Sequence, residues 1–364
     1  MGLALSLERT KQFYRDHEPL CTALFFIAGF LFDTIAVGRI DRLHNVIHQA
    51  SYLSLCAFFT SLELQELHGR FSPPERLKTA WRYHVGATHF MLGTLLNIYT
   101  LFFFKSASLG TSFLFLLILA GLLAVNELKP FKDAGATLRM ALFSLCLISY
   151  FTYLVPMMLG FIGGLAFIGS IAAACACVFL LVFLLRNRLP APVIERHVVV
   201  PFGLIALGFS ALYALKAIPP VPLSLSTIGI YHEVRREGDR FALTMTRPAW
   251  KFWQRGDQTF LARPGDAIHC FVSVFSPTRF QERLQLRWQF DDPAEGWQEA
   301  GAMPLAVVGG RDGGFRAESV KSRYQPGRWR VRVETSDQRE LGRIDFTVVE
   351  DLSPQQPSSR TIWR

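Results

Sequence analysis

The chain has 364 residues, of which 51% are apolar, against about 45–50% in an average soluble domain. Residues 1–220 carry 17 Lys and Arg and 11 Asp and Glu, whereas residues 221–364 carry 21 and 18. The first part has too few charged residues for a water-exposed surface, so the composition excludes a simple soluble domain. The last part has the composition of an ordinary globular domain.

Long apolar segments dominate the first 220 residues. A membrane-spanning helix needs about 20 mostly apolar residues, because irregular backbone cannot face lipid. The sequence predicts seven such helices, in the ranges Leu20–Gly38, Asn45–Leu62, Val85–Phe104, Leu109–Val125, Leu138–Leu159, Phe161–Leu185 and Val198–Ile218. The predicted organisation is an N-terminal segment 1–19, an all-α membrane domain 20–218, a Pro-rich spacer 219–224, a β domain 225–351 and a disordered tail 352–364.

Basic residues of the connecting segments lie on alternate sides of this helix bundle. Counting Lys and Arg gives 13 on the side of the N-terminus and 4 on the opposite side. Because basic loops stay in the cytoplasm, this asymmetry predicts a cytoplasmic N-terminus. An odd number of spans then places the C-terminal domain across the membrane, and the lipid bilayer is the first expected partner.

Polar residues cluster near the predicted outer end of the first two helices, at Asp33, Arg39, Asp41, His44 and His48. An intramembrane carboxylate costs roughly 2.5–3.5 kcal/mol, so Asp33 is expected to have a partner. His44 and His48 lie one helical turn apart, which would let two imidazoles share a metal ion or handle a proton. The favoured alternative is a capped helix start with interfacial histidines, because no third metal ligand is visible. The sequence predicts no cofactor and leaves a metal open.

The C-terminal part predicts an antiparallel β-sandwich, because apolar and polar residues alternate in short segments separated by turn residues. Trp329-Arg-Val-Arg-Val-Glu334 shows the alternation best, with Trp329 inward and Glu334 outward. Strands are expected near Phe241–Thr246, Ala267–Phe275, Leu284–Phe290, Pro304–Val308, Phe315–Val320, Trp329–Glu334 and Gly342–Val349. The expected core contains Trp288, Trp329, Val331, Val333, Phe346 and Val348.

Three C-terminal segments carry a family resemblance: Gly309-Gly-Arg-Asp-Gly-Gly-Phe-Arg316, Gly327-Arg-Trp-Arg-Val-Arg-Val-Glu-Thr335 and Leu341-Gly-Arg-Ile-Asp-Phe-Thr-Val348. Together they resemble the bacterial family catalogued as domain of unknown function 2914. In the membrane half, Gly29-Phe-Leu-Phe-Asp33 and Arg39-Ile-Asp41 are similar to the multi-spanning members of that family. The resemblance implies a multi-pass protein of the Gram-negative inner membrane with a periplasmic β domain. It brings no known activity.

Arginine accounts for 19 of the 21 basic residues in the last 144 residues. Seven of them crowd the final third of the domain: Arg311, Arg316, Arg323, Arg328, Arg330, Arg332 and Arg343. Because the guanidinium fork suits carboxylate and phosphate, Arg311, Arg316 and Arg323 are predicted to bind an anionic group. The alternative, favoured by a domain net charge of only +3, is that outward arginines pair with nearby acids. Those acids are Glu318, Glu334, Asp337 and Asp345.

Three aromatic residues fall within the four-residue segment Trp250-Lys-Phe-Trp253, between Arg247 and Arg255. Rings bounded by cations can stack on a sugar or insert into a membrane interface, which makes Trp250 and Trp253 candidate binding residues. They could equally pack under the sandwich as one helical turn. The sequence leaves these two interpretations open.

The sequence contains no Gly-x-Ser-x-Gly, His-Glu-x-x-His or phosphate-cradling motif. The predicted function is therefore a non-catalytic envelope recognition, sensing or accessory module, whose periplasmic β-sandwich binds an anionic ligand or a protein partner. Expected partners are the bilayer, an envelope protein, an anionic polymer or a lipid headgroup, and nucleic acid is not expected. The alternative is a membrane-embedded enzyme or transporter that uses the Asp33, Asp41, His44 and His48 cluster.

Overall fold

The computed structural model describes residues 42–126, 135–278, 280–309, 314–355 and 357–364. The chain forms two compact units. The first unit is drawn from Met1–Leu101, Ile118–Leu147 and Val178–Gly203, and the second from Phe102–Leu117, Ile148–Cys177 and Leu204–Arg364. The second unit therefore combines segments of several helices with the whole β-rich part of the chain.

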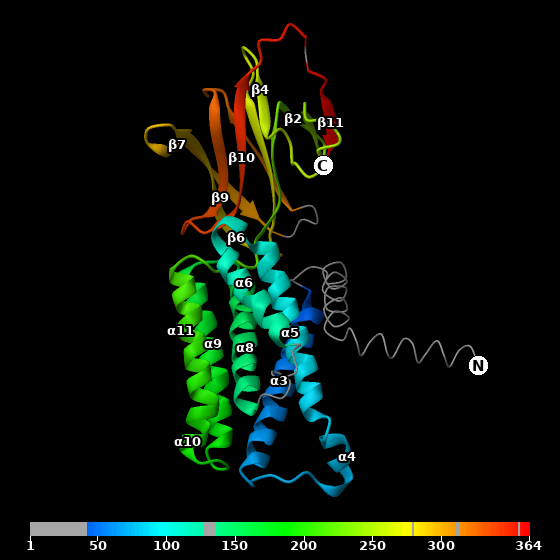
Figure 1. Ribbon diagram of the computed structural model, residues 1–364, viewed down its shortest axis with the longest axis vertical. Helices are drawn as coiled ribbons and strands as arrows, with labels where there is room; N and C mark the ends of the chain where they lie inside the picture. The colour runs from blue at the N-terminus through cyan, green and yellow to red at the C-terminus, as the bar shows by residue number, and fades with distance from the viewer. Residues whose placement is uncertain (1–41, 127–134, 279, 310–313, 356) are drawn as a thin grey trace, which may run out of the picture. The chain divides into compact units, whose positions relative to one another are not determined.

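The described residues before Leu215 form mainly helices (Figure 1). The longer helices are α3 (Leu43–Leu67), α5 (His84–Ser106), α6 (Leu109–Asn126), α8 (Ala136–Leu159), α9 (Gly164–Leu185) and α11 (Val200–Ala214). Short helical segments are η1 (Glu75–Leu77), α4 (Lys78–Trp81), α10 (Ala191–Ile194) and η2 (Glu195–Val199). Six of the predicted spans overlap these helices, and the first, Leu20–Gly38, lies outside the described residues.

Within the described residues, four helical stretches are long and apolar enough to cross a membrane: His84–Ser106, Ala136–Leu159, Gly164–Leu185 and Ala191–Ala214. Helix α3 is not among them, and it carries Glu63 and Glu66. Glu63 is buried and accepts a hydrogen bond of 3.0 Å from Nε of Arg139 on α8, inside the first unit. An arginine partner compensates the cost of burying this carboxylate. The total of seven spans stays a prediction.

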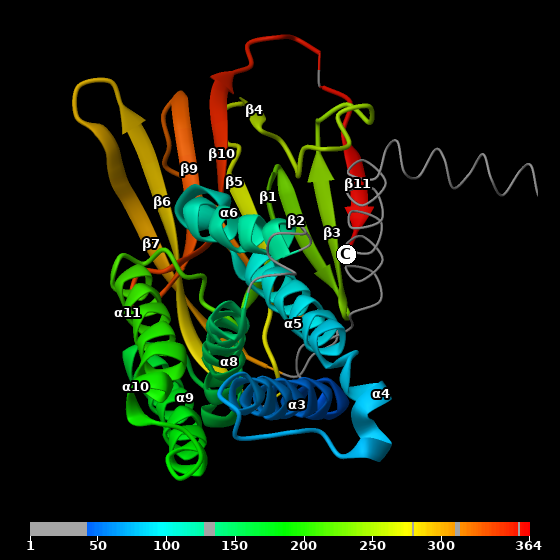
Figure 2. The ribbon, with the colours of Figure 1, turned by 60° about the horizontal axis from the view of Figure 1, so that its bottom comes forward.

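The β domain follows the helices and consists of three sheets (Figures 1 and 2). Its strands are β1 (Ser224–Tyr231), β2 (Glu233–Glu237), β3 (Arg240–Met245), β4 (Thr259–Ala262), β5 (Ile268–Phe275), β6 (Gln281–Asp292), β7 (Gly296–Val308), β8 (Phe315–Lys321), β9 (Gly327–Thr335), β10 (Glu340–Glu350) and β11 (Arg360–Trp363). The sheet orders are β1-β5-β8, β4-β10-β9-β6-β7 and β11-β3-β2. All pairs are antiparallel except β4 with β10.

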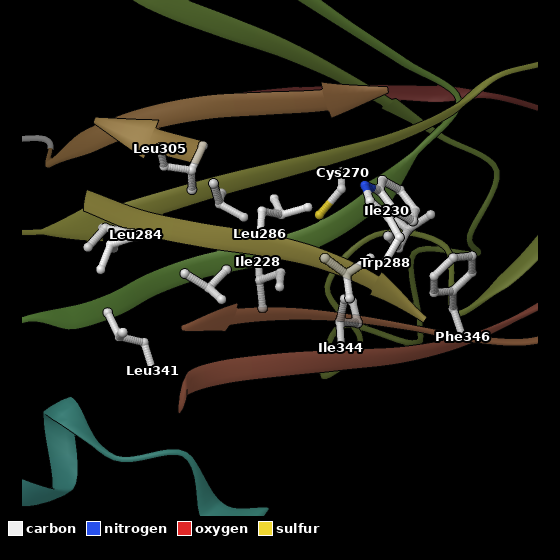
Figure 3. Packing of buried hydrophobic residues seen from close by; sticks show 14 of the residues in the cluster. Ile228, Ile230, Cys270, Leu284, Leu286, Trp288, Leu305, Leu341, Ile344 and Phe346 are labelled. Carbon is white, nitrogen blue, oxygen red and sulfur yellow. The ribbon is translucent and has the colours of Figure 1, made fainter. Parts of the chain in front are cut away.

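One hydrophobic core is shared by the first two of these sheets. It takes Ile228 and Ile230 from β1, Leu284 and Leu286 from β6, and Ile344 from β10 (Figure 3). The predicted core is confirmed, since all six of its residues are buried there: Trp288, Trp329, Val331, Val333, Phe346 and Val348. The two indole N–H groups are satisfied, because Trp288 donates to Ser319 Oγ at 3.0 Å and Trp329 to the Gln325 carbonyl at 2.9 Å. Alternation along the strands thus locates the core correctly.

The structure adds one detail and one correction at the ends of the β domain. In the Pro-rich spacer 219–224, Pro219 to Leu223 are buried, and Leu223 belongs to the core. The tail 352–364 is not disordered throughout, since β11 pairs with β3 and places Thr361 opposite Thr244. Strands β1, β2, β4 and β11 were not predicted, whereas each of the seven predicted strands overlaps an observed one.

Candidate functional site

A charged pocket of about 500 Å³ lies in the second unit, against the five-stranded sheet. Its charged lining residues are Lys216, Arg287, Glu299, Arg332, Glu334 and Glu340. Thr111, Leu215 and Gln338 complete the lining. Pockets of this size accept small ligands, and a few placed polar groups decide which chemistry they accept.

Strand register creates the charge pattern of the pocket. Arg287 on β6 lies opposite Arg332 on β9, and Arg332 lies opposite Arg343 on β10. We call Arg287, Arg332 and Arg343 the arginine row. Two residues further along β9, and three along β10 because the register shifts between Glu340 and Gly342, Glu334 lies opposite Glu340, so a pair of acids follows the row. We call Glu334 and Glu340 the glutamate pair.

Like charges directly opposite each other destabilise a sheet, and the glutamate pair offsets this repulsion. Glu340 accepts 3.0 Å and 2.7 Å hydrogen bonds from Nε of Arg332 and of Arg343. Glu334 accepts from Nε of Arg287, and this hydrogen bond raises the pKa of the Arg287 guanidinium. Both glutamates are only 3% exposed, so their charges are shielded from water and depend on the arginines.

Helical segments of the second unit complete the surroundings of the glutamate pair. Ser108, directly before α6, donates its hydroxyl hydrogen to Glu340. Gly110 allows the Arg343 guanidinium to approach the helix backbone, because a Cβ at that position would clash with it. Lys216, just after α11, donates to Gln338 at 3.1 Å. Glu340 thus bonds both to arginines of the sheet and to Ser108 before α6, and Arg343 lies against Gly110 of α6.

This arrangement is suited to binding an anion. Glu340 occupies the Nε groups of two arginines, and Arg287 also pairs with the more exposed Glu299 at 2.8 Å, so three carboxylates serve the three guanidiniums of the row. Each guanidinium has five N–H donors, and its planar fork matches phosphate and carboxylate oxygens. Lys216 adds a further cation on the wall of the pocket. In the part of the chain that the structure describes, no three His, Cys, Asp or Glu side chains gather as metal ligands.

Arg316 and Arg323, two of the three arginines predicted to bind anions, do not line this pocket. Arg311 lies outside the described residues. Arg316 on β8 donates to the Asp239 carbonyl at 2.6 Å, and Arg323 is exposed beyond the end of the same strand. The alternative prediction, that outward arginines pair with nearby acids, describes several arginines of the domain, both in the arginine row and outside it. For example, Arg330 donates to Asp345 at 2.6 Å and lowers the pKa of that carboxyl.

The remaining predicted site residues fall in other places. Asp33, Arg39 and Asp41 lie outside the described residues. His44 and His48 are exposed on α3, and the His48 ring lies 4.2 Å from the ring of Tyr52. Trp250 and Trp253 come together, with ring centroids 5.6 Å apart, and both are exposed. The interpretation that they plug the core is therefore wrong.

Sequence reasoning missed Lys216, Arg287 and Glu340 as members of one site. The alternating arginines of β9 give a partial signal, because Arg330 and Arg332 must share one face of their sheet. Glu334 was expected on the solvent side, and it is buried because Arg287 and the pocket wall cover it. The register between strands far apart in sequence, which aligns the row, cannot be deduced from one strand alone.

The fold and the site define a chain with apolar helices, a multi-sheet β domain and a pocket lined by charged residues. Residues 281–348, from the start of β6 into β10, match the family described as "Protein of unknown function (DUF2914)". The match confirms the resemblance for this C-terminal region, and it contains the whole arginine row. The helices and strands β1 to β5 lie outside the matched residues.

No curated protein matches the chain. Among solved structures, an immunoglobulin-like protein from Pseudomonas aeruginosa is similar, with 13% identity over 35% of this chain and 98% of that chain. A β-glucosidase from Listeria innocua in complex with glucose shows 15% identity over 25% of this chain and 15% of that chain. Their TM-scores are 0.23 and 0.19, so neither likeness informs the function.

Proposed function

We propose that the chain is a multi-pass protein of the bacterial inner membrane that works as a non-catalytic recognition module. Its β domain, a periplasmic β-sandwich, binds an anionic group in the pocket of the arginine row. The observation that carries this proposal is the alignment of three arginines beside a 500 Å³ pocket that Lys216 also lines, which sets four cations against the three carboxylates of Glu299, Glu334 and Glu340. An embedded enzyme or transporter has less support, because the described members of its cluster, His44 and His48, are exposed on α3.

The ligand chemistry follows from the donors. Guanidinium and ammonium groups favour phosphate or carboxylate oxygens, and Arg in particular binds them through two parallel hydrogen bonds. An anionic lipid headgroup and a soluble phosphorylated molecule both carry a phosphate group that these donors could bind. Lys216 follows the last helix directly, and four apolar helical stretches support insertion in a bilayer, so the lipid headgroup is the source we propose.

Substitution of Lys216 by Gln is expected to weaken binding of phosphatidylglycerol about fivefold, since one cation near an anionic headgroup contributes about 1 kcal/mol. The measurement is lipid retention by native mass spectrometry of the full chain in phosphatidylcholine nanodiscs doped with phosphatidylglycerol. Lys78, whose ammonium pairs with Glu75 on the surface, gives the matched control Lys78→Gln.

A parallel titration with inorganic phosphate separates the two sources. Retention of phosphatidylglycerol without phosphate binding supports the lipid. Phosphate binding that Lys216→Gln weakens, without lipid retention, supports the pocket but replaces the lipid by a soluble ligand. Equal behaviour of wild type, Lys216→Gln and Lys78→Gln toward both probes would contradict an anion site.

The proposed orientation has its own test. A phosphatase that is active only outside the cytoplasm should be active when fused after Arg364 and inactive when inserted between α3 and η1. This expectation rests on the 13 to 4 asymmetry of Lys and Arg between the two sides. A β-galactosidase reporter at the same positions should give the opposite pattern. If the phosphatase inserted between α3 and η1 were active, alone or together with the fusion after Arg364, the proposed orientation would be wrong.

A further inference from the structure

The connection between β3 and β4 carries a group of exposed aromatic rings that the anion pocket does not involve. Trp250, Phe252 and Trp253 are 63%, 81% and 60% exposed. The ring of Trp253 lies 5.6 Å from that of Trp250 and 5.3 Å from that of Phe252, in edge-to-face contacts. We call residues 248–254 the aromatic loop. Large apolar side chains that gather on a surface in this way mark an interaction site.

The backbone around the aromatic loop is held firmly by buried polar contacts. Asp257 is 1% exposed, and its carboxylate accepts the backbone N–H groups of Thr246 at 3.0 Å and Arg247 at 2.7 Å. Gly256 has a φ of 75° and lies so close to Ile230 of β1 that no side chain would fit there. The backbone at both ends of the aromatic loop is therefore fixed, which reduces the conformational entropy that the loop loses when a ligand binds.

A polar pocket of about 220 Å³ lies next to the loop. Its lining includes Arg247, Lys251, Gln254, Gln258 and Thr259. One terminal nitrogen of the Arg247 guanidinium donates to the Lys251 carbonyl. A guanidinium carries five N–H donors, so Arg247 keeps donors that oxygen atoms of a ligand in the pocket can accept.

We propose that the aromatic loop and this pocket form a saccharide-binding site. The C–H faces of pyranose rings stack on Trp250 and on Trp253, one ring on each indole because the two indole planes are 64° apart, and each indole offers a flat apolar surface with a negative face. Hydroxyl oxygens of the sugar accept hydrogen bonds from the guanidinium of Arg247, and its hydroxyl groups donate to and accept from the amide of Gln254. The pocket is smaller than the 300–1,000 Å³ that encloses a drug-sized ligand, so it takes a single ring while neighbouring rings lie on the exposed aromatics.

One feature favours a sugar over a bilayer surface, which aromatic residues and cations also contact. The pocket beside the loop is lined by the side chains of Gln254, Gln258, Thr259 and Arg247, which can hydrogen-bond the hydroxyl groups of a sugar. Insertion of aromatic rings into a bilayer interface needs no such pocket.

The test uses the full chain in a detergent without a sugar headgroup, because a maltoside would compete for the site. Maltotetraose, N-acetylchitotetraose and tetragalacturonate serve as neutral, acetylated and acidic probes, with tryptophan fluorescence and calorimetry as readouts. At least one probe is expected to bind. The double substitution Trp250→Ala, Trp253→Ala should weaken that binding at least about tenfold, and Gln254→Ala should weaken it as well.

Trp363→Ala, which removes an exposed tryptophan on β11, is the matched control and should bind like wild type. Binding of none of the three saccharides would overturn the proposal, as would equal binding by wild type and the double variant. A second arm measures flotation with phosphatidylcholine–phosphatidylglycerol vesicles, using solubilised protein. Vesicle binding that depends on the two tryptophans, without saccharide binding, would assign the loop to the membrane surface instead.

Discussion

Replacement of Trp329 by alanine is expected to lower the free energy of unfolding of the β domain by about 3–5 kcal/mol, the usual cost of removing a buried tryptophan. Trp329 is 3% exposed and packs in the core at a ring distance of 5.2 Å from Phe290. Its N–H also holds the Gln325 carbonyl at the turn before β9. The cavity that the missing indole leaves in the core and the loss of its hydrogen bond to Gln325 both destabilise the region around β9.

Cys270 provides the measurement, because it is the only cysteine after residue 177. Its thiol is buried in the core, and burial raises its pKa, so labelling by a thiol reagent requires the domain to open. In a full chain whose other cysteines are changed to alanine, Trp329→Ala should speed labelling by about two to four orders of magnitude. Trp363→Ala should leave the rate within about threefold. Equal rates for the two variants would contradict the assignment of Trp329 to the core.

The second large effect is expected at Glu340. Substitution by Gln removes the charge that Arg332 and Arg343 share, and removing one partner of a buried ion pair costs about 3–5 kcal/mol. The two arginine side chains are 27% and 26% exposed, so we expect the lower end of this range. The Cys270 labelling rate should then rise about 100-fold.

Asp345→Asn is the matched control for Glu340→Gln. Asp345 also pairs with an arginine of the same sheet, but its side chain is 47% exposed. Exposed pairs contribute about 0–1 kcal/mol, so the labelling rate should rise by no more than about fivefold. If Glu340→Gln labelled no faster than Asp345→Asn, the glutamate pair would not stabilise the arginine row.

Helices and strands that a single continuous run of residues specifies could be predicted from the sequence. Alternation along β9 and β10 identified Trp329, Val331 and Phe346 as core residues, because the face of a side chain follows from its position in the strand. Apolar runs likewise marked the helices, although α3 shows that a predicted span can carry buried charge when Arg139 faces Glu63. Short strands such as β4 and β11 left too few alternating residues to be recognised.

The candidate site was less predictable, since it depends on which strands become neighbours. Arg287 and Arg343 are far apart in the sequence, and both lie beside Arg332 only because β9 runs between β6 and β10. Trp250 is exposed on a loop whose ends are held by long-range contacts, the Asp257 carboxylate on the Thr246 and Arg247 N–H groups and Gly256 against Ile230. Neither relation can be deduced from the composition of the segments involved.

Strand β11 has a consequence for solubility. In the sheet β11-β3-β2, it occupies one edge of β3, and the backbone of Arg364 bonds that of Phe241 at 2.8 Å and 2.9 Å. An uncovered edge offers a row of N–H and C=O groups to any other extended chain and so promotes aggregation. The last residues of the chain, with Arg360 and Arg364 at either end of the strand, therefore protect β3 from pairing with another molecule.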